Sequence, residues 1–126
     1  VYTHWKMQQQ KFPSADTIKA SYNSNTIKLI DNFKIELEKK GANLFITYPS
    51  YQASSFDKSI MQIKRVEKEL INTNFKLLRT PERYRIPDSM MFNTPYHLLK
   101  IGVDYRTELL IEDIQQVRTH NNVYKK

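Results

Sequence analysis

Two short apolar runs constrain the fold of this 126-residue chain more than any other feature. The first, residues 43–48 (NLFITY), is nearly continuous in apolar residues and is closed by Pro49. The second, residues 75–78, is ended by Thr80 and Pro81. Short runs bounded by turn residues are typical of strands that are buried on both faces. We therefore expect two short strands in the interior of the fold.

Helical patterns alternate with these runs. Apolar residues recur at three- and four-residue steps over 25–40 and 56–72, and a third helix is predicted over 103–117. Gly41 supplies the positive φ that ends the first helix. On the last helix, the side chains expected to face the interior are Leu109, Leu110, Ile114 and Val117. Strands that alternate with helices pair in parallel through right-handed crossovers, so the sequence predicts an α/β fold.

Two strands are too few for such a fold. Each would leave an apolar edge unpaired, and a stable doubly wound sheet needs roughly four or five strands. We therefore expect a partial three-layer α/β/α sandwich of the flavodoxin-like type, with the N-terminal half of its sheet preceding Val1. The open edges should pair with that missing half or with another copy of the chain.

The chain is expected to form a single partial domain. Residues 1–22 read as an irregular lead-in, because they show no clean period. Residues 23–118 follow the order helix, strand, helix, strand, loop, helix, and residues 119–126 read as a basic tail.

Composition excludes several classes of site. The chain has two glycines and no cysteine. Glycine-rich phosphate loops and dinucleotide fingerprints are therefore excluded, and so are disulfides, thiolate nucleophiles and cysteine zinc sites. We expect no cofactor and no metal. No run of about eighteen apolar residues occurs, so no membrane span is expected.

The net charge of +7 raises the question of a nucleic-acid partner. Lysine and arginine are interleaved with acidic residues, as in KIELEKKG and KRVEKELI, and no block of five like charges occurs. This pattern favours solvated helix faces, and we expect no nucleic-acid partner. A basic nucleic-acid binder is the weakest of the functional alternatives.

The stretch 92–114, FNTPYHLLKIGVDYRTELLIEDI, carries the clearest functional signal. His97 follows the proline turn at Pro95 and precedes the last predicted helix. The loop that holds it, residues 80–100, is long for a compact domain, and ordered loops of this length are usually functional. The alternative is a histidine that only hydrogen-bonds the loop to the helix.

Residues 42–114 resemble the C-terminal half of an SGNH (GDSL-type) hydrolase, above all in NLFITYPSY and in RTPERYRIPDSMMFNTPYHLLKIGVDYRTELLIEDI. The branch they most resemble holds esterase- or acyltransferase-like proteins of bacterial envelope and polysaccharide functions. The resemblance implies an α/β/α sandwich with a nucleophilic serine in a GDS-like motif, and an Asp and a His just before the last helix. Only that last block is matched, since no GDS-type motif occurs in the chain.

Carried over residue by residue, His97 matches the catalytic base of the family. Its acidic orienting partner falls at Asn93, where related sequences usually show Asp. Replacing such an Asp by Asn costs about 10⁴ in rate, so either this copy is impaired or Asp88 substitutes. A Ser–His dyad oriented by a backbone carbonyl is a further alternative. Ser50 is a poor nucleophile, because it lacks the glycine-flanked elbow that exposes a serine.

Other residues near this block have expected roles. Tyr48 and Tyr51 lie at the carboxyl end of the first predicted strand, where ligands bind in open α/β sheets. Tyr96 is expected to pack under the loop. Arg106 is expected to tie the loop down by pairing with Asp88 or Asp104, and the alternative is that it binds a carboxylate or phosphate together with Thr107.

The resemblance implies the C-terminal portion of an esterase or acyltransferase. It would act on ester-linked acyl groups of a small molecule or a glycan, and only together with its serine-bearing half. The alternative is a non-catalytic interaction or binding protein with a degenerate SGNH fold. The neutral Asn93 favours that alternative.

Overall fold

The computed structural model describes residues 8–20 and 22–123, with side chains described as far as Val117. It contains helices α1 (Ser24–Lys39), α2 (Ala53–Lys58), α3 (Ile60–Ile71) and α4 (Lys100–Val123). Short strands alternate with them: β1 (Phe45–Ile46), β2 (Tyr51–Gln52), β3 (Lys76–Leu77), β4 (Arg85–Ile86), β5 (Met91–Thr94) and β6 (His97–Leu98). Two 3-10 turns, η2 (Pro81–Tyr84) and η3 (Asp88–Met90), lie between β3 and β5. The fold is mixed α/β.

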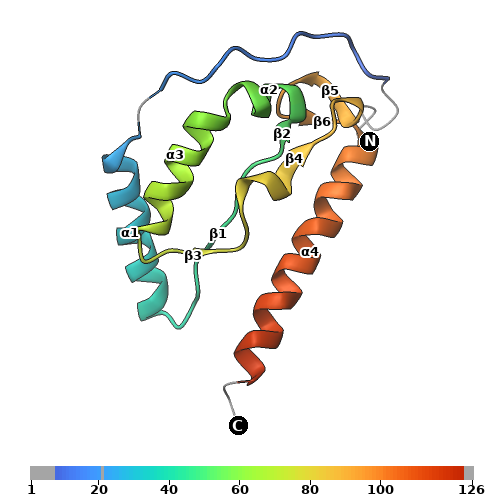
Figure 1. Cartoon of the computed structure of the whole chain (residues 1–126). Coiled ribbons are helices and arrows are strands. Elements are labelled where there is room, and N and C mark those ends of the chain that lie inside the picture. Colours follow the sequence, from blue (N-terminus) through green and yellow to red (C-terminus); the bar gives the residue numbers. More distant parts are fainter. Residues whose placement is uncertain (1–7, 21, 124–126) are drawn as a thin grey trace.

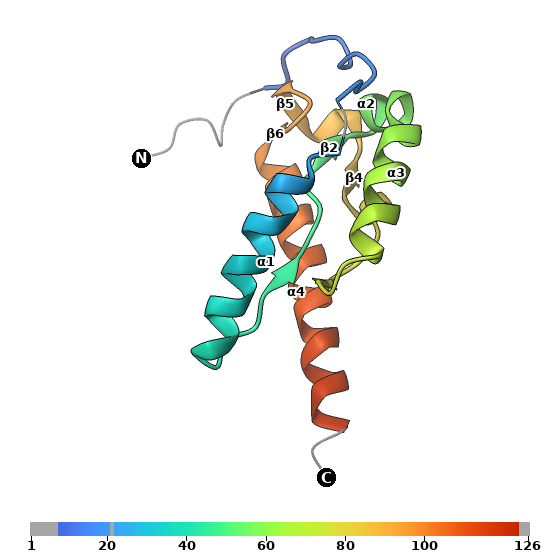
Figure 2. The ribbon, with the colours of Figure 1, turned by 90° about the vertical axis from the view of Figure 1, so that its left-hand side faces the viewer.

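The two predicted strands pair in parallel, as the alternation predicts. Strand β1 pairs with β3 in the register Phe45↔Lys76, and β2 pairs with β4 in the register Tyr51↔Arg85. Helices α1 and α3 lie on one side of β1 and β3, and α4 lies on the other side (Figures 1 and 2). The residues between the strands and α4 therefore form the centre of the molecule.

The strands are less buried than the sequence predicts. Both residues of β1 are half-buried, and Lys76 of β3 is exposed. In the described part of the chain each sheet has two strands, so no further strand covers the outer edge of β1 or β3. These strand pairs do not by themselves form the expected flavodoxin-like three-layer sandwich with buried parallel strands. That part of the prediction stays an expectation.

Both ends of α1 follow from local side-chain chemistry. The helix begins after Asn23, whose side-chain oxygen accepts the N–H of Asn25 at 3.0 Å and so satisfies a free amide of the first turn. It ends at Lys39, and Gly41, two residues further on, has a φ of +75°. The N–H of Ala42 then bonds back to the carbonyl oxygen of Leu37 at 3.0 Å, as in a Schellman motif.

The predicted second helix is broken in two. Ser59 separates α2 from α3, with φ −106° and ψ 9°. Its hydroxyl oxygen accepts the N–H of Ile18 at 3.2 Å, and the hydroxyl oxygen of Ser55 accepts the N–H of Ala15 at 2.8 Å. Both donors belong to residues 8–20, here called the strap. The break is therefore associated with long-range hydrogen bonds that a helical period does not reveal.

The strap contains neither helix nor strand and crosses the top of the molecule in Figure 1. The N–H of Gln10 donates to the carbonyl oxygen of Phe92 at 3.0 Å. At the other end, the side-chain amide of Gln62 on α3 donates to the carbonyl oxygen of Ala20. The strap thus connects β5 with α2 and α3.

Helix α4 differs from its prediction in both length and orientation. It begins three residues before Val103 and continues to Val123, so part of the expected basic tail at 119–126 is helical. Leu109 is buried as expected, but Ile114 is 46% exposed. Asp113, which is 1% exposed, takes the inward position instead. The expected inward face was therefore wrong at Ile114.

The buried carboxylate of Asp113 is held by one buried and two partly exposed polar side chains. It accepts hydrogen bonds from the fully buried Tyr84 hydroxyl and from Arg79 Nε at 2.9 Å, and Arg83 Nε lies 3.3 Å from the same carboxylate. Burial alone would raise the pKa of the Asp113 carboxyl. The hydrogen bonds from Tyr84 and Arg79 and the charge of Arg83 outweigh burial and hold this pKa below its ordinary value. The partners of Asp113 thus favour its inward position over that of Ile114.

None of the described helices is both long enough and apolar enough to cross a membrane.

Candidate functional site

His97 lies on a β-hairpin, where the sequence predicts a loop. Strands β5 and β6 pair antiparallel, with Met91 opposite Leu98 and Thr94 opposite His97. The two residues between the strands are Pro95 and Tyr96. The hydroxyl oxygen of Thr94 accepts the N–H of His97 at 3.1 Å, which closes the turn. His97 is therefore fixed by backbone pairing rather than by loop packing alone.

The hairpin is anchored at its turn and at its base. The N–H of Gln52 in β2 donates to the carbonyl oxygen of Pro95 at 2.8 Å. At the base, the N–H of Leu99 donates to the carbonyl oxygen of Met90 at 2.9 Å. A Cβ atom on Gly102 would lie 2.6 Å from the same oxygen. Only a glycine lets α4 approach the hairpin this closely.

The structure brings together two of the three predicted site residues, His97 and Asn93. Nδ1 of the imidazole lies 2.9 Å from Oδ1 of the Asn93 amide. An amide oxygen only accepts, so this hydrogen bond requires the proton to be on Nδ1. In the neutral imidazole this places the unprotonated nitrogen at Nε2, which is the tautomer that a general base needs. The ring also meets Phe92 edge-on, with centroids 5.3 Å apart.

The third predicted site residue, Asp88, anchors the start of α2. Its carboxylate accepts the backbone N–H of Ser54 at 3.0 Å, the Ser54 hydroxyl at 2.6 Å and the side-chain amide of Gln52 at 3.2 Å. A carboxylate at the first turn of a helix is favoured by the free N–H groups there. Asp88 therefore supports the segment that holds the hairpin turn.

Arg106 does not pair as predicted. Its guanidinium lies over the ring of Tyr84, with Cζ 3.8 Å from the ring centroid, and donates to the carbonyl oxygen of Tyr48 at 3.3 Å. The carboxylate of Asp104 is bound by Lys100 instead, at 2.6 Å. Arg106 thus connects α4 with Tyr48, two residues after the end of β1.

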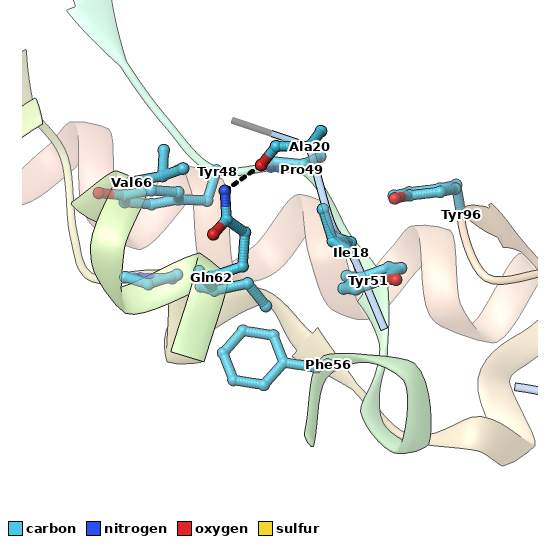
Figure 3. Close-up of a pocket in the computed structure, with 11 residues that line it drawn as sticks. Ile18, Ala20, Tyr48, Pro49, Tyr51, Phe56, Gln62, Val66 and Tyr96 are labelled. Atoms are coloured by element: carbon cyan, nitrogen blue, oxygen red, sulfur yellow. Dashed lines mark hydrogen bonds between the residues drawn. The ribbon is translucent and has the colours of Figure 1, made fainter. Parts of the chain in front are cut away.

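An apolar cavity of about 250 Å³ lies beside the hairpin turn (Figure 3). Tyr96 lies at its rim, 56% exposed, and stacks on Tyr51 with ring centroids 4.7 Å apart and planes 16° apart. Gln62 reaches across to Ala20 of the strap (Figure 3). The lining residues are Ile18, Ala20, Tyr48, Pro49, Tyr51, Phe56, Gln62, Ile63, Val66, Pro81 and Tyr96.

Sequence reasoning named three of the tyrosines but missed the cavity. Tyr48 and Tyr51 were singled out for their place at the carboxyl end of a strand. Tyr96 was expected to pack under the loop, which was wrong, because it is 56% exposed. The cavity comes from the strap, the end of the first strand segment, α2, α3 and two turns, which no local pattern connects. The one sequence feature that could have indicated the cavity is the high density of aromatic residues and prolines around the ends of the predicted strands.

In the part of the chain that the structure describes, no three His, Asp or Glu side chains gather in an arrangement that could hold a metal ion. The amino-acid sequence and the fold were also compared with known proteins. No family model, no curated protein and no solved structure matches the chain. The case for a function therefore depends on the geometry of the described residues.

Proposed function

We propose that this chain carries the catalytic histidine of an SGNH-like esterase or acyltransferase that acts on ester-linked acyl groups. The observation that carries the proposal is the 2.9 Å contact between His97 Nδ1 and Asn93 Oδ1, on a hairpin fixed at both ends. Nε2 of His97 would take the proton from a serine hydroxyl as the serine attacks the ester carbonyl. The imidazolium would then return the proton to the leaving alcohol.

Asn93 supplies part of what an aspartate would supply. Its amide oxygen selects the Nδ1–H tautomer and holds the ring, as an asparagine does in papain-like Cys–His–Asn proteases. It adds no negative charge to stabilise the imidazolium. The loss of about 10⁴ in the chymotrypsin-type Asp-to-Asn change comes from the wrong tautomer, and Oδ1 facing Nδ1 avoids that tautomer. We therefore propose that the catalytic rate of this site lies between that of a full triad and that of an inactive site.

The serine and the oxyanion donors are proposed to come from a segment that adds strands to the pair β1 and β3. Helices on both sides of a parallel pair are what one edge of an α/β/α sandwich contains. The half-buried residues of β1 leave apolar surface at an open edge, which favours strand addition. A second copy of the chain is the alternative partner at this edge.

The test is an esterase assay with p-nitrophenyl acetate. The isolated chain should show no turnover above background, because it lacks the nucleophile. Supplying the proposed serine-bearing segment should restore turnover, and His97→Ala should abolish it. His4→Ala is the matched control, because it removes an imidazole outside the block. Turnover by the isolated chain that survives His97→Ala would contradict the proposal.

A second candidate is a non-catalytic binding protein with a degenerate SGNH fold. The neutral amide beside His97 and the apolar cavity both favour it. The Asn93→Asp variant, assayed with the proposed serine-bearing segment, separates the two. Turnover in that variant supports an enzyme, and no turnover in either form supports a binding protein.

A further inference from the structure

We propose that the cavity beside Tyr96 binds an aliphatic acyl chain of medium length. That this chain is the acyl part of an ester substrate rests on the proposed function. Binding of the chain itself rests on the cavity alone.

The lining of the cavity selects an apolar ligand. It contains tyrosine, phenylalanine, proline and aliphatic side chains, and none of the lining residues is charged. The amide nitrogen of its one amide side chain, Gln62, already donates to Ala20. Besides the hydroxyls of Tyr48, Tyr51 and Tyr96, the wall is mainly apolar, so it offers few partners to the several hydroxyls that a sugar ring would bury there. An alkyl chain needs no hydrogen-bond partner.

The volume of the cavity also favours a chain over a larger substrate. At about 250 Å³ it exceeds the roughly 150 Å³ of an apolar cavity that holds benzene. It is smaller than the ~300–1,000 Å³ typical of pockets for drug-sized ligands. A chain of several carbons fits this range, whereas an acylated glycan would have to place its sugar outside.

The position of the cavity connects it with the histidine. Tyr96, at the cavity rim, directly precedes His97 in the hairpin. Tyr51, on which Tyr96 stacks, directly precedes Gln52, whose N–H holds the carbonyl of Pro95. The wall of the cavity and the catalytic histidine thus share one anchored turn. A chain that fills the cavity from this side has its carboxyl end at the hairpin.

The experiment is isothermal titration calorimetry of the whole chain with sodium acetate, butyrate, hexanoate and octanoate, each below its micelle concentration. The association constant should rise roughly fourfold for each CH₂ added until the cavity is full, as expected for burial of an alkyl chain. An association constant that does not depend on chain length would overturn the proposal. Tighter binding of benzyl alcohol than of octanoate would overturn it in favour of an aromatic ligand.

Variants locate the binding in this cavity. Val66→Phe fills the cavity and should weaken octanoate binding at least tenfold, and Ile63→Phe should do the same if the first variant does not fold. Met61→Phe, at an 84% exposed position of the same helix, should leave binding unchanged. Equal binding in folded Val66→Phe and Met61→Phe would place the site elsewhere and overturn the proposal.

The His97→Ala variant separates this proposal from the esterase function. The alkyl chain does not contact the imidazole in the proposed complex, so octanoate should bind this variant as it binds the natural chain. Loss of binding in His97→Ala would show that the histidine, not the cavity, holds the carboxylate. A failed esterase assay together with chain-length-dependent binding leaves the cavity site in place.

Discussion

Gly102 of α4 and Met90 of η3 are in direct backbone contact, so close that a Cβ atom on Gly102 would lie 2.6 Å from the Met90 carbonyl oxygen. Leu98, next to His97, would also lie 3.2 Å from that Cβ atom. The close spacing between the hairpin and α4 therefore depends on residue 102 being a glycine, which has no side chain.

Gly102→Ala should move the hairpin. Forcing a methyl group into this contact costs about 1–3 kcal/mol, and the better helix propensity of alanine returns up to about 1 kcal/mol. We expect a net loss of about 1–2 kcal/mol in urea denaturation, together with changed NMR shifts of the His97 ring. Gly41→Ala is the control, because Gly41 has a positive φ in open space. It should lower stability through backbone strain and leave the His97 signals unchanged.

Asp113→Asn should destabilise the fold in a pH-dependent way. The Asp113 carboxyl has a lowered pKa in the folded state. Its ionised form therefore contributes stability above the unfolded-state pKa of about 3.9, and this contribution is lost as the pH falls through the folded-state value. We expect the substitution to cost roughly 2–4 kcal/mol at pH 7, with the difference shrinking below about pH 4.

The measurement is urea denaturation of both proteins at pH 7 and at pH 3. Asp104→Asn is the control, because the Lys100–Asp104 pair is about half exposed and contributes roughly 0.5 kcal/mol or less. A stability difference for Asp113→Asn that is the same at both pH values would contradict the role assigned to the carboxylate.

Ser59→Ala and Ser55→Ala should release the strap. Each removes an acceptor for a strap amide, at Ile18 or at Ala15. Ser59→Ala should cost about 1 kcal/mol, and Ser55→Ala about 1–3 kcal/mol, because the buried Ser55 hydroxyl also donates to Gln52 Oε1. Hydrogen exchange of the two strap amides should become faster in the matching variant. Ser24→Ala, at the exposed start of α1, should leave both exchange rates unchanged. Unaltered exchange at Ile18 in Ser59→Ala would show that this hydrogen bond does not hold the strap.

Under the proposed esterase function, Asn93→Asp should raise the rate of the chain supplied with the proposed serine-bearing segment by at least tenfold. A carboxylate 2.9 Å from Nδ1 would stabilise the imidazolium that forms when His97 takes the serine proton. Asn93→Ala should lower the rate, and Asn32→Asp on the exposed side of α1 should not change it. A rate that falls in Asn93→Asp would argue that position 93 does not orient a catalytic base.

The parts of the fold that the sequence predicted are those set by local chemistry. Gly41 ends α1 through its positive φ, and the apolar runs before Pro49 and Thr80 contain the parallel strands β1 and β3. The break at Ser59 was missed because it involves a hydrogen bond from Ile18, 41 residues away. The inward position of Asp113 was missed because apolar periodicity cannot anticipate the hydrogen bonds and ion pairs that its carboxylate makes with Tyr84, Arg79 and Arg83.

In the candidate site, too, the local relations could be predicted from the sequence and the long-range ones could not. The resemblance to SGNH hydrolases selected His97 and Asn93, and the contact between them is a four-residue, local one. Asp88 was considered as a substitute acid because it is near in sequence. Its carboxylate caps α2 through Ser54, a relation that only the folded chain contains. The cavity needs residues from the strap to the hairpin, so no window of the sequence could reveal it.

The protonation of His97 is the most direct test of the central claim. We would record long-range ¹H–¹⁵N NMR spectra of the imidazole at pH 8 in the natural chain and in Asn93→Ala. If Asn93 Oδ1 orients a general base, the natural chain carries the proton on Nδ1 and has an unprotonated Nε2, and Asn93→Ala loses that preference. A natural chain with the proton on Nε2 would contradict the claim.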